Sequence, residues 1–425
     1  MKKSLLAVAA IGAFASAAQA QSSVTVYGIL DVGYIGGNTS VQDSSKGNTA
    51  GYNQGTAKST VSQFGQSAEQ TSRLGFKGSE DLGNGKSAFF TAEFQLYPQD
   101  QTLSGNTNST NTNGGLLNRQ TFVGLKDNKI GQVAVGLQYT PVFNAAAATD
   151  VGQLNNMAGN VIYASSSGIT SGQAGTNSLG FTNRTANTLS FQTAKFSGFQ
   201  ASGIYTLNNK NQTETGVGSS STTGGNTNAS GWGLGADYTY NKFYITAAYQ
   251  ALKQLTTSND LTAIWVNQQA SGATAAPVAA SAATAAAQIT GTASNVQDNQ
   301  LYAAATYDFG ILKAYAQYVT RKATDTDNTN YYGKRAAEQI GVRGYITPTI
   351  EGWASAGLGR YTTFGTTQPT ANFSGWQLGS NYWLSKRTNL YAIYGSTVTS
   401  TAATAAGTTV GGSMNNYAVG VRHTF

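Results

Sequence analysis

The sequence predicts an all-β protein, a 16-stranded antiparallel transmembrane β-barrel with long external loops and short periplasmic turns. Three observations indicate this fold class: short segments that alternate apolar and polar residues, connections that alternate in length, and a chain with only 10% charged residues. Side chains of a strand point alternately to its two faces. Alternation along many strands therefore indicates a sheet with lipid on one face and water on the other.

The C-terminal segment shows the alternation most clearly. One face carries Tyr417, Val419, Val421 and Phe425. The other carries Asn416, Ala418, Gly420, Arg422 and Thr424. Residues 199–207 and 243–250 alternate in the same way. We therefore interpret these segments as strands that separate an apolar from a polar environment.

The connections alternate between short and long. Seven tight turns are expected at 81–85, 127–129, 196–198, 241–242, 309–310, 347–348 and 385–387. Eight long Asn/Thr/Ser/Gly-rich stretches lie near 36–62, 98–117, 140–182, 209–230, 254–297, 322–335, 361–374 and 398–413. Fifteen connections join sixteen strands, and short turns at one end with long loops at the other are typical of outer-membrane barrels.

The N-terminus predicts export. Met1-Lys2-Lys3 is basic, residues 5–18 are small and apolar, and Ala18-Gln19-Ala20 fits a cleavage site. We expect residues 1–20 to be a cleaved secretory signal peptide and residues 21–425 to form a single domain. The apolar run is shorter than the roughly 20 residues of a membrane-spanning helix.

Composition excludes several chemistries. The chain has no Cys and a single His, His423, so thiol nucleophiles, zinc sites and most His-based catalysis are excluded, and we expect no enzyme, metal or cofactor. The GKS at 85–87 resembles a phosphate-binding loop, but Glu80 stands where that motif needs Gly and the flanks alternate like strands. Loss of Lys2 and Lys3 would lower the net charge from +7 to +5, and without a Lys/Arg-rich run this favours anion preference over nucleic-acid binding.

A family resemblance covers the whole mature chain. VTVYGILDVG at 24–33, SRLGFKGSEDLGNG at 72–85, NRQTFVGL at 118–125, QYTP at 138–141, FSGF at 196–199 and the terminal VGVRHTF are similar to general porins of Gram-negative outer membranes, in particular the betaproteobacterial subgroup. The resemblance implies a trimeric, water-filled porin barrel, narrowed by its third long loop folding inside. That inward-folded constriction loop corresponds here to about 140–182.

The resemblance also implies which residues line the constriction. Arg73 and Arg184 match two arginines of the basic wall, and alternation independently places Arg73, Lys77 and Arg184 on the polar face. Asp150 is the only charge on the loop and is expected to be its acidic residue. Further lumen candidates by alternation are Asp31, Glu93 and Lys313. Leu137 departs from the family, which often has Arg just before QYTP. The pattern leaves two orientations for Leu137, toward the lumen or toward lipid.

The terminal strand resembles the family's assembly signal. Tyr417, Val419, Val421 and Phe425 would be presented to the barrel-assembly machinery, or would simply face lipid, and both roles are compatible. His423 lies on the same face.

We therefore expect an outer-membrane channel for passive diffusion of ions and small hydrophilic solutes, with a mild anion preference, embedded in outer-membrane lipid as a homotrimer. A substrate-selective outer-membrane channel and a β-rich surface adhesin are the alternatives. The adhesin would need polar outer faces, whereas one face of nearly every segment is apolar.

Overall fold

The computed structural model describes residues 23–43, 53, 55–99, 116–164, 179–212, 225–256, 294–325, 332–363, 370–403 and 409–425. The expected signal peptide, 1–20, lies outside these residues. Within the described part of the chain, no helix is long and apolar enough to cross a bilayer.

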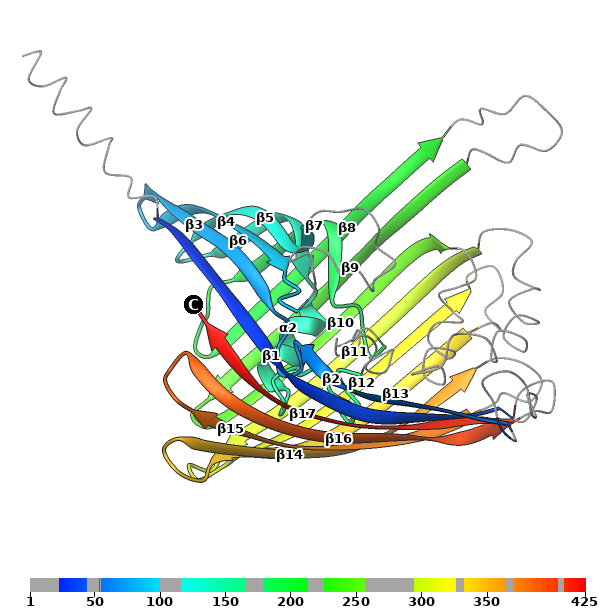
Figure 1. The fold of residues 1–425 in the computed structure, drawn as a ribbon. Coiled ribbons are helices and arrows are strands. Elements are labelled where there is room, and N and C mark those ends of the chain that lie inside the picture. Colours follow the sequence, from blue (N-terminus) through cyan, green and yellow to red (C-terminus); the bar gives the residue numbers. More distant parts are fainter. Residues whose placement is uncertain are drawn as a thin grey trace, which may run out of the picture.

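The first half of the barrel contains nine strands: β1 (Ser23–Asp43), β2 (Thr56–Gln66), β3 (Arg73–Gly83), β4 (Lys86–Gln95), β5 (Leu117–Asp127), β6 (Gly131–Tyr139), β7 (Arg184–Thr193), β8 (Phe199–Gln212) and β9 (Gly225–Tyr240). The second half contains β10 (Phe243–Thr256), β11 (Ser294–Asp308), β12 (Lys313–Asp325), β13 (Tyr332–Tyr345), β14 (Ile350–Thr363), β15 (Thr370–Trp383), β16 (Thr388–Ala403) and β17 (Thr409–Thr424). The helix α2 (Pro141–Thr149) follows β6. Figure 1 shows these strands wrapping around the helix.

The sheet closes on itself through β1. One edge of β1 pairs antiparallel with β17, from Ile29 opposite Thr424 to Asp43 opposite Val410. The other edge pairs with β3 along its first half and with β2 along its second half. The segments β2 and β3 therefore share one position in the wall, and the result is the closed antiparallel barrel of sixteen strands that the sequence predicts.

The shared position differs from the prediction of a single long loop over 36–62. Strands β1 and β2 extend through much of that stretch, because its Ser, Thr and Asn side chains suit a solvated strand as well as a loop. The wall strand is instead interrupted at 67–72, where Ser67 adopts a φ of 62°. Ala68 and Glu69 in this interruption are buried.

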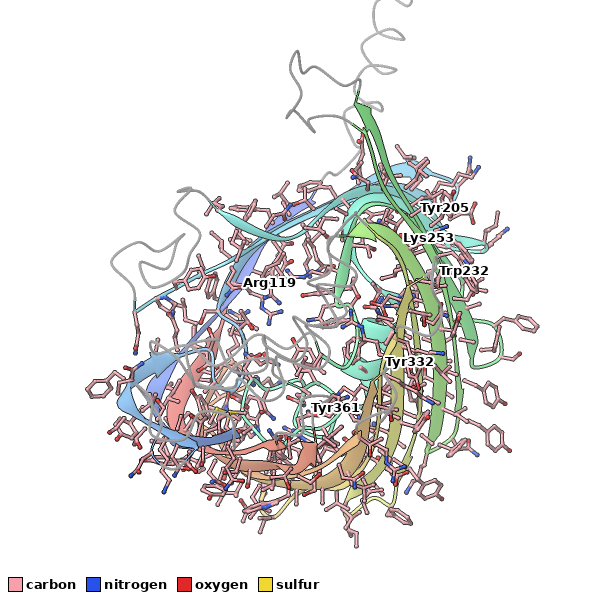
Figure 2. The ribbon with its side chains drawn as sticks, turned by 90° about the vertical axis from the view of Figure 1, so that its right-hand side faces the viewer. Arg119, Tyr205, Trp232, Lys253, Tyr332 and Tyr361 are labelled. Carbon is pink, nitrogen blue, oxygen red and sulfur yellow. The ribbon has the colours of Figure 1, made fainter. Side chains whose placement is uncertain are left out.

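The two faces of the wall differ as the alternation predicts. On β7, Leu189 and Phe191 are 50% and 46% exposed, whereas Thr188, which precedes Leu189, is fully buried. On β10, Ile245 is exposed and Thr246 and Gln250 are buried. Figure 2 shows Tyr205 and Trp232 outside the ring of strands and Arg119 and Tyr361 within it. The apolar face is the one that lipid would solvate.

The GKS motif lies in a hairpin. Strand β3 ends at Gly83, Asn84 and Gly85 turn the chain with φ of 54° and 75°, and Lys86 opens β4. Asn and Gly tolerate this left-handed conformation. The sequence around Lys86 therefore forms strand and turn, as predicted.

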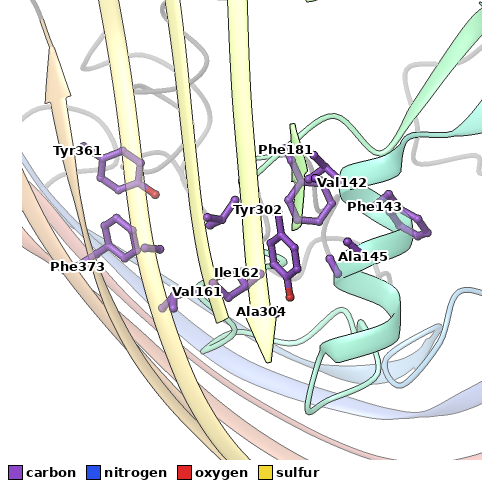
Figure 3. Close-up of a cluster of buried hydrophobic side chains, with 14 of the residues drawn as sticks. Val142, Phe143, Ala145, Val161, Ile162, Phe181, Tyr302, Ala304, Tyr361 and Phe373 are labelled. Atoms are coloured by element: carbon purple, nitrogen blue, oxygen red, sulfur yellow. The ribbon is translucent and has the colours of Figure 1, made fainter. Parts of the chain in front are cut away.

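The hydrophobic core of the protein lies inside the barrel. Val142, Phe143 and Ala146 of α2 pack with Phe181, and with Tyr302 and Ala304 on β11. Figure 3 shows this cluster between the helix and the inner wall. The chain after β6 thus folds against the interior surface rather than away from it.

Candidate functional site

Three arginines gather on the inner wall formed by β3 to β7. Arg119 donates from Nε to Oε1 of Glu93 at 2.8 Å. Nη1 of Arg73 lies 3.9 Å from the same oxygen. The two guanidinium groups therefore share one carboxylate. Their combined positive charge exceeds the single negative charge of that carboxylate.

Arg184 adds a third cation without an acid. Its Nη1 donates to the backbone oxygen of Arg119 at 3.1 Å, and its Cζ lies 5.8 Å from the ring centroid of Tyr139. Among the described residues no carboxylate lies within 4.0 Å of it. Tyr139 also accepts from Nη2 of Arg119 at 2.9 Å, so one ring organises both arginines.

Sequence reasoning missed Arg119, and a β-bulge is the reason. Glu93 pairs with Gln120 while Phe94 pairs with Asn118, so Arg119 is an extra residue in β5. Val123 is 63% exposed on the outer face, and unbroken alternation would place residue 119 on that same face. A bulge redirects a side chain, and here it turns Arg119 inward, where it is buried. The NRQTFVGL motif contained the residue but gave no sign of the bulge.

Lys77 lies beside this group rather than in it. Its Nζ lies 5.3 Å from the ring centroid of Tyr27. Tyr27 in turn donates to Oε2 of Glu93 at 3.2 Å. Lys77 is exposed, so its charge is solvated and is one aromatic ring away from the acid that the arginines share.

The chain after β6 turns into the barrel as a helix. Thr140 caps α2, since its Oγ1 accepts from the amide of Phe143 at 3.2 Å, and Pro141 occupies the first turn, where its missing N–H costs nothing. The ring of Phe143 stacks on Tyr139 with centroids 4.0 Å apart. On the far side of the helix, Thr149 bonds to the hydroxyl of Tyr302 at 2.6 Å. The helix therefore connects the arginine wall to β11.

Beyond the helix, residues 150–164 follow the inner wall of β13 to β17. Gln377 on β15 donates to the backbone oxygens of Met157 and Ala158, at 3.0 and 2.6 Å. The amide of Ala158 donates to Asn416, and that of Val161 to Gln339. The loop is thus held by inward-facing amide side chains of the wall.

Tyr163 brings this loop back toward the arginines. Its ring packs edge-on against Phe143, with centroids 6.2 Å apart. Burial raises the pKa of the Tyr163 hydroxyl, and the nearby charges of Arg119, Arg184 and Arg73 oppose that shift. The ring of Tyr163 therefore lies on the side of the loop that is nearest to the arginine group.

Comparisons with known proteins agree with this architecture. The family description "Gram-negative porin" matches residues 7–403. The chain belongs to the Gram-negative porin family. This confirms the resemblance carried by the sequence motifs, and places the protein in the outer membrane.

The relatives are outer membrane porins of betaproteobacteria. This porin is 40% identical over 140 residues to an outer membrane porin protein of Bordetella pertussis, covering 32% of this chain and 34% of the relative. It is 31% identical over 216 residues to outer membrane porin protein 32 of Delftia acidovorans, covering 49% and 51%. The alignments thus span about a third to a half of these relatives.

Solved structures share the fold. The anion-selective porin from Comamonas acidovorans matches with a TM-score of 0.60 and 21% identity, covering 95% of this chain and 100% of that one. OmpT of Vibrio cholerae matches with a TM-score of 0.56 and 12% identity, covering 95% and 98%. At these identities the likeness concerns the fold alone.

The structure places Asp150 outside the group of Arg73, Arg119 and Arg184, contrary to its expected role as the acid that faces them. Asp150 is buried at the end of α2, where its Oδ2 accepts from the amide of Leu154 and its Oδ1 from Asn160, both at 2.8 Å. Burial raises the pKa of this carboxyl. Gln317 on β12 also hydrogen-bonds to this carboxyl, and the charge of Arg343 on β13 acts on it. Asp150 therefore organises the turn and ties it to the wall, and Glu93 is the acid beside Arg73 and Arg119.

Asp31, a predicted lumen residue, is buried at the interruption of the wall. Its Oδ2 accepts from the amides of Glu69 and Gln70, at 2.9 and 2.6 Å, and its Oδ1 from the hydroxyl of Tyr391 at 2.6 Å. These bonds hold 67–72 inside the barrel, where Ser67 accepts from Asn156 of the loop. Asp31 therefore faces inward but supports the backbone.

The remaining inward charges of this porin differ in their pairing. Arg343 and Glu351 form a two-bond ion pair, both bonds 2.6 Å long, and Arg422 lies 3.5 Å from Glu69. The Nζ of Lys313 lies 5.2 Å from the ring centroid of Tyr315. On the wall opposite the arginine group, Arg343 and Arg422 are therefore neutralised by acids, whereas Arg335 on β13 has no carboxylate within 4.0 Å among the described residues.

Two further positions concern the faces of the porin wall. Ala134 and Gln138 on β6 are buried and Val135 is exposed. Leu137 follows Val135 by two residues, and this alternation assigns it to the outer face. Tyr417, Val419 and Phe425 are also exposed, while Ala418 and Arg422 are buried. Phe425 completes the strand by exchanging two backbone hydrogen bonds with Gly28, at 3.0 and 3.1 Å.

Proposed function

We propose that this porin is a water-filled channel for the passive diffusion of ions and small hydrophilic solutes across the outer membrane, with a mild preference for anions. One observation carries the proposal: Arg73, Arg119 and Arg184 gather on the inner wall around a single carboxylate, that of Glu93. Charged groups in a pore tune its ion selectivity, and a low-dielectric wall focuses their field into the lumen.

The preference is expected to be mild because most other inward charges are paired. Arg343 has Glu351, and Arg422 has Glu69. Among the described residues, the unbalanced charge therefore comes mainly from Arg184, from the excess over Glu93 and from the buried Arg335, which has no carboxylate within 4.0 Å. The likeness to the anion-selective porin of Comamonas acidovorans concerns the fold, so the anion preference is argued from these residues alone.

We infer that the chain from 140 to 182 narrows the channel. Its described residues lie against the inner wall from β8 to β17, and Tyr163 faces the arginines on β3 to β7. Solutes would then pass between the loop and the arginine wall. Arg73, Arg119 and Arg184 form the basic side of this passage, with Lys77 and Lys313 as more distant cations.

Planar-bilayer recording tests the proposed function. Stepwise, ohmic conductance in symmetric KCl, with a reversal potential that favours Cl⁻ under a KCl gradient, is the expected result. Ion transport without saturation by any one solute supports diffusion. Block by a single carboxylate, phosphate or sugar would favour the substrate-selective alternative, and folded protein without conductance would contradict the channel.

We also propose a homotrimer. Porin structures that share this fold include a trimer form of OmpT of Vibrio cholerae, which supports the proposal at the level of the fold. Native mass spectrometry in detergent should give a mass three times that of the mature chain. A single-chain mass, with conductance steps that never group in threes, would contradict it.

The outer face of β17 is proposed as the assembly signal. Tyr417, Val419, Val421 and Phe425 form a regular apolar face, which the barrel-assembly machinery would recognise during insertion. Phe425→Ser should lower the amount of porin in the outer membrane while detergent refolding of purified protein stays efficient. Equal loss of refolding in vitro would show a structural role only.

A further inference from the structure

Two lysines meet on the outer face of the wall. Lys322 on β12 and Lys334 on β13 are exposed and lie directly opposite each other in the antiparallel pairing. Lys322 alternates with the exposed Tyr318, and Lys334 with the exposed Ile340, so both belong to the face that points away from the interior. Among the described residues no carboxylate lies within 4.0 Å of either lysine. Like charges directly opposite each other on a sheet are destabilising, so this pair lacks a counter-charge.

The pair lies at the end of the barrel that has the long connections. Lys322 is close to the end of β12 at Asp325, and Lys334 is close to the start of β13 at Tyr332. The Nζ of Lys322 lies 4.6 Å from the ring centroid of Tyr332, which holds the side chain at this end. In outer-membrane barrels the long connections are external. The two lysines are therefore expected on the side of the outer leaflet.

An apolar hollow lies on the same outer face, on the periplasmic side of the lysines. It has a volume of about 920 Å³, and larger side chains such as Phe199, Ile340 and Leu358 border it. Its floor contains small outward-facing residues of β10 to β14: Ala247, Ala303, Ala305, Ala316 and Ala356. Pockets of roughly 300–1,000 Å³ hold whole small molecules. The lipid-facing wall is therefore recessed here, with room for an acyl chain.

Tyr318 and Glu338 line the hollow at the end nearest the lysines. They are cross-strand partners, four residues along β12 and β13 from Lys322 and Lys334, which corresponds to roughly 13 Å of strand. Tyr318 is 40% exposed, and tyrosines on the outer face are typical of the membrane–water interface. Glu338 repels anions, so a negative headgroup is favoured at the lysines and not in the hollow. The order along the wall is thus cations, interfacial tyrosine and apolar recess.

We propose that this surface binds an anionic, phosphate-bearing lipid of the outer leaflet, with its phosphate between Lys322 and Lys334 and an acyl chain in the hollow. The phosphate supplies the counter-charge that the pair lacks, and its oxygens accept hydrogen bonds from both ammonium groups. A free phosphate ion would neutralise the lysines but would make no use of the hollow beside them, so the two features together favour a lipid. The inference does not depend on the conductance or the ion preference of the channel.

Native mass spectrometry of the porin in detergent tests the lysine pair, with dioleoyl phosphatidic acid as the added lipid. Lys322→Gln/Lys334→Gln should bind this lipid roughly thirtyfold more weakly than the native porin, because each lysine near a charged lipid surface contributes a factor of about five. Lys58→Gln/Lys129→Gln is the control with the same loss of charge. Lys58 is exposed on β2 opposite Ser40, and Lys129 is exposed in the turn after β5. This control should bind like the native porin.

Ala316→Phe tests the hollow, because the larger side chain would fill part of the recess on β12. It should weaken the binding of phosphatidic acid severalfold while the barrel still folds, since residue 316 points outward. Ala392→Phe is the matched control. Ala392 is exposed on β16 and lines a separate outer hollow, so this variant should bind phosphatidic acid like the native porin.

Unchanged binding in Lys322→Gln/Lys334→Gln would overturn the proposal, and so would an equal loss in its control. Equal retention of dioleoyl phosphatidylcholine, whose choline neutralises its phosphate, would show an apolar surface without charge selectivity. Inorganic phosphate that displaces phosphatidic acid at equal concentration would show a site for the free ion and would also overturn the lipid. The native porin alone gives a further test if a variant fails to fold. A higher ammonium acetate concentration should weaken the retention of phosphatidic acid by screening the lysines, and retention independent of salt would contradict their role.

Discussion

The Nε of Arg119 lies 2.8 Å from Oε1 of Glu93, and this contact sets the charge of the inner wall. Arg73 approaches the same oxygen at 3.9 Å, so a single carboxylate serves two guanidinium groups. Arg184 lies against the backbone of Arg119 and adds a third. The wall therefore presents positive charge that is only partly neutralised.

Replacing Glu93 should strengthen the anion preference. Glu93→Gln removes the carboxylate while keeping the size of the side chain. A unit charge about 8 Å from a passing ion contributes roughly 0.5 kcal/mol in water. Its removal should raise the permeability of Cl⁻ and lower that of K⁺ by roughly twofold each, so the Cl⁻/K⁺ permeability ratio should rise by roughly fivefold. Reversal potentials under a KCl gradient measure the ratio. Glu338→Gln is the control and should leave the ratio unchanged, because Glu338 is exposed on β13 in alternation with the outward-facing Ile340.

Neutralising Asp150 should leave selectivity nearly unchanged. Its carboxylate bonds to Leu154 and Asn160 within the loop and has no ion pair with Arg73, Arg119 or Arg184. Asp150→Asn weakens those bonds and should lower stability by roughly 1 kcal/mol, measured by urea unfolding of the detergent-solubilised porin. A reversal potential that moves as far as that of Glu93→Gln would contradict this prediction and would show that Asp150 acts on ions in the constriction.

Gln377 is expected to fix the width of the channel by anchoring the loop. Gln377→Leu removes its bonds to Asn155, Met157 and Ala158 and leaves the loop carbonyls without their donor. Loss of a buried hydrogen-bond partner costs about 1–3 kcal/mol. The loop should then fluctuate, giving larger open-channel noise and a changed mean conductance.

Gln200→Leu is the matched control for Gln377, since Gln200 donates to the backbone of Thr193 within the wall. This variant should have the open-channel noise and the mean conductance of the native channel. Noise that rises equally in both variants would show that any loss of a wall amide disturbs the barrel, and would contradict a specific anchoring role.

The barrel could be predicted from the sequence because its signal is repeated in every strand. Leu189 and Thr188 follow the period of two, and the turn at Asn84 and Gly85 has the residue types that its backbone needs. The interruption at 67–72 could not be predicted. It depends on Asp31 and Tyr391, residues far apart in sequence that meet only after the barrel closes.

The candidate site was predictable where strands are regular and not where they are irregular. Arg73 and Arg184 were found by alternation and resemblance, and both lie in the arginine group. Arg119 was missed because a bulge reverses its face. Asp150 was expected in the constriction because it is the one charge on the loop, but charge alone does not show whether a carboxylate bonds to solute, to arginine or to its own backbone.

The central claim is that the arginine group on the inner wall gives the channel its anion preference. Arg184 tests it most directly, because it has no carboxylate within 4.0 Å among the described residues and its removal breaks no ion pair. The measurement is the reversal potential under a KCl gradient for the native porin, Arg184→Met and Arg360→Met. Arg360 is exposed on β14 in alternation with the outward-facing Leu358. A reversal potential that moves toward K⁺ in Arg184→Met alone is the predicted result. Native selectivity in Arg184→Met would contradict the account.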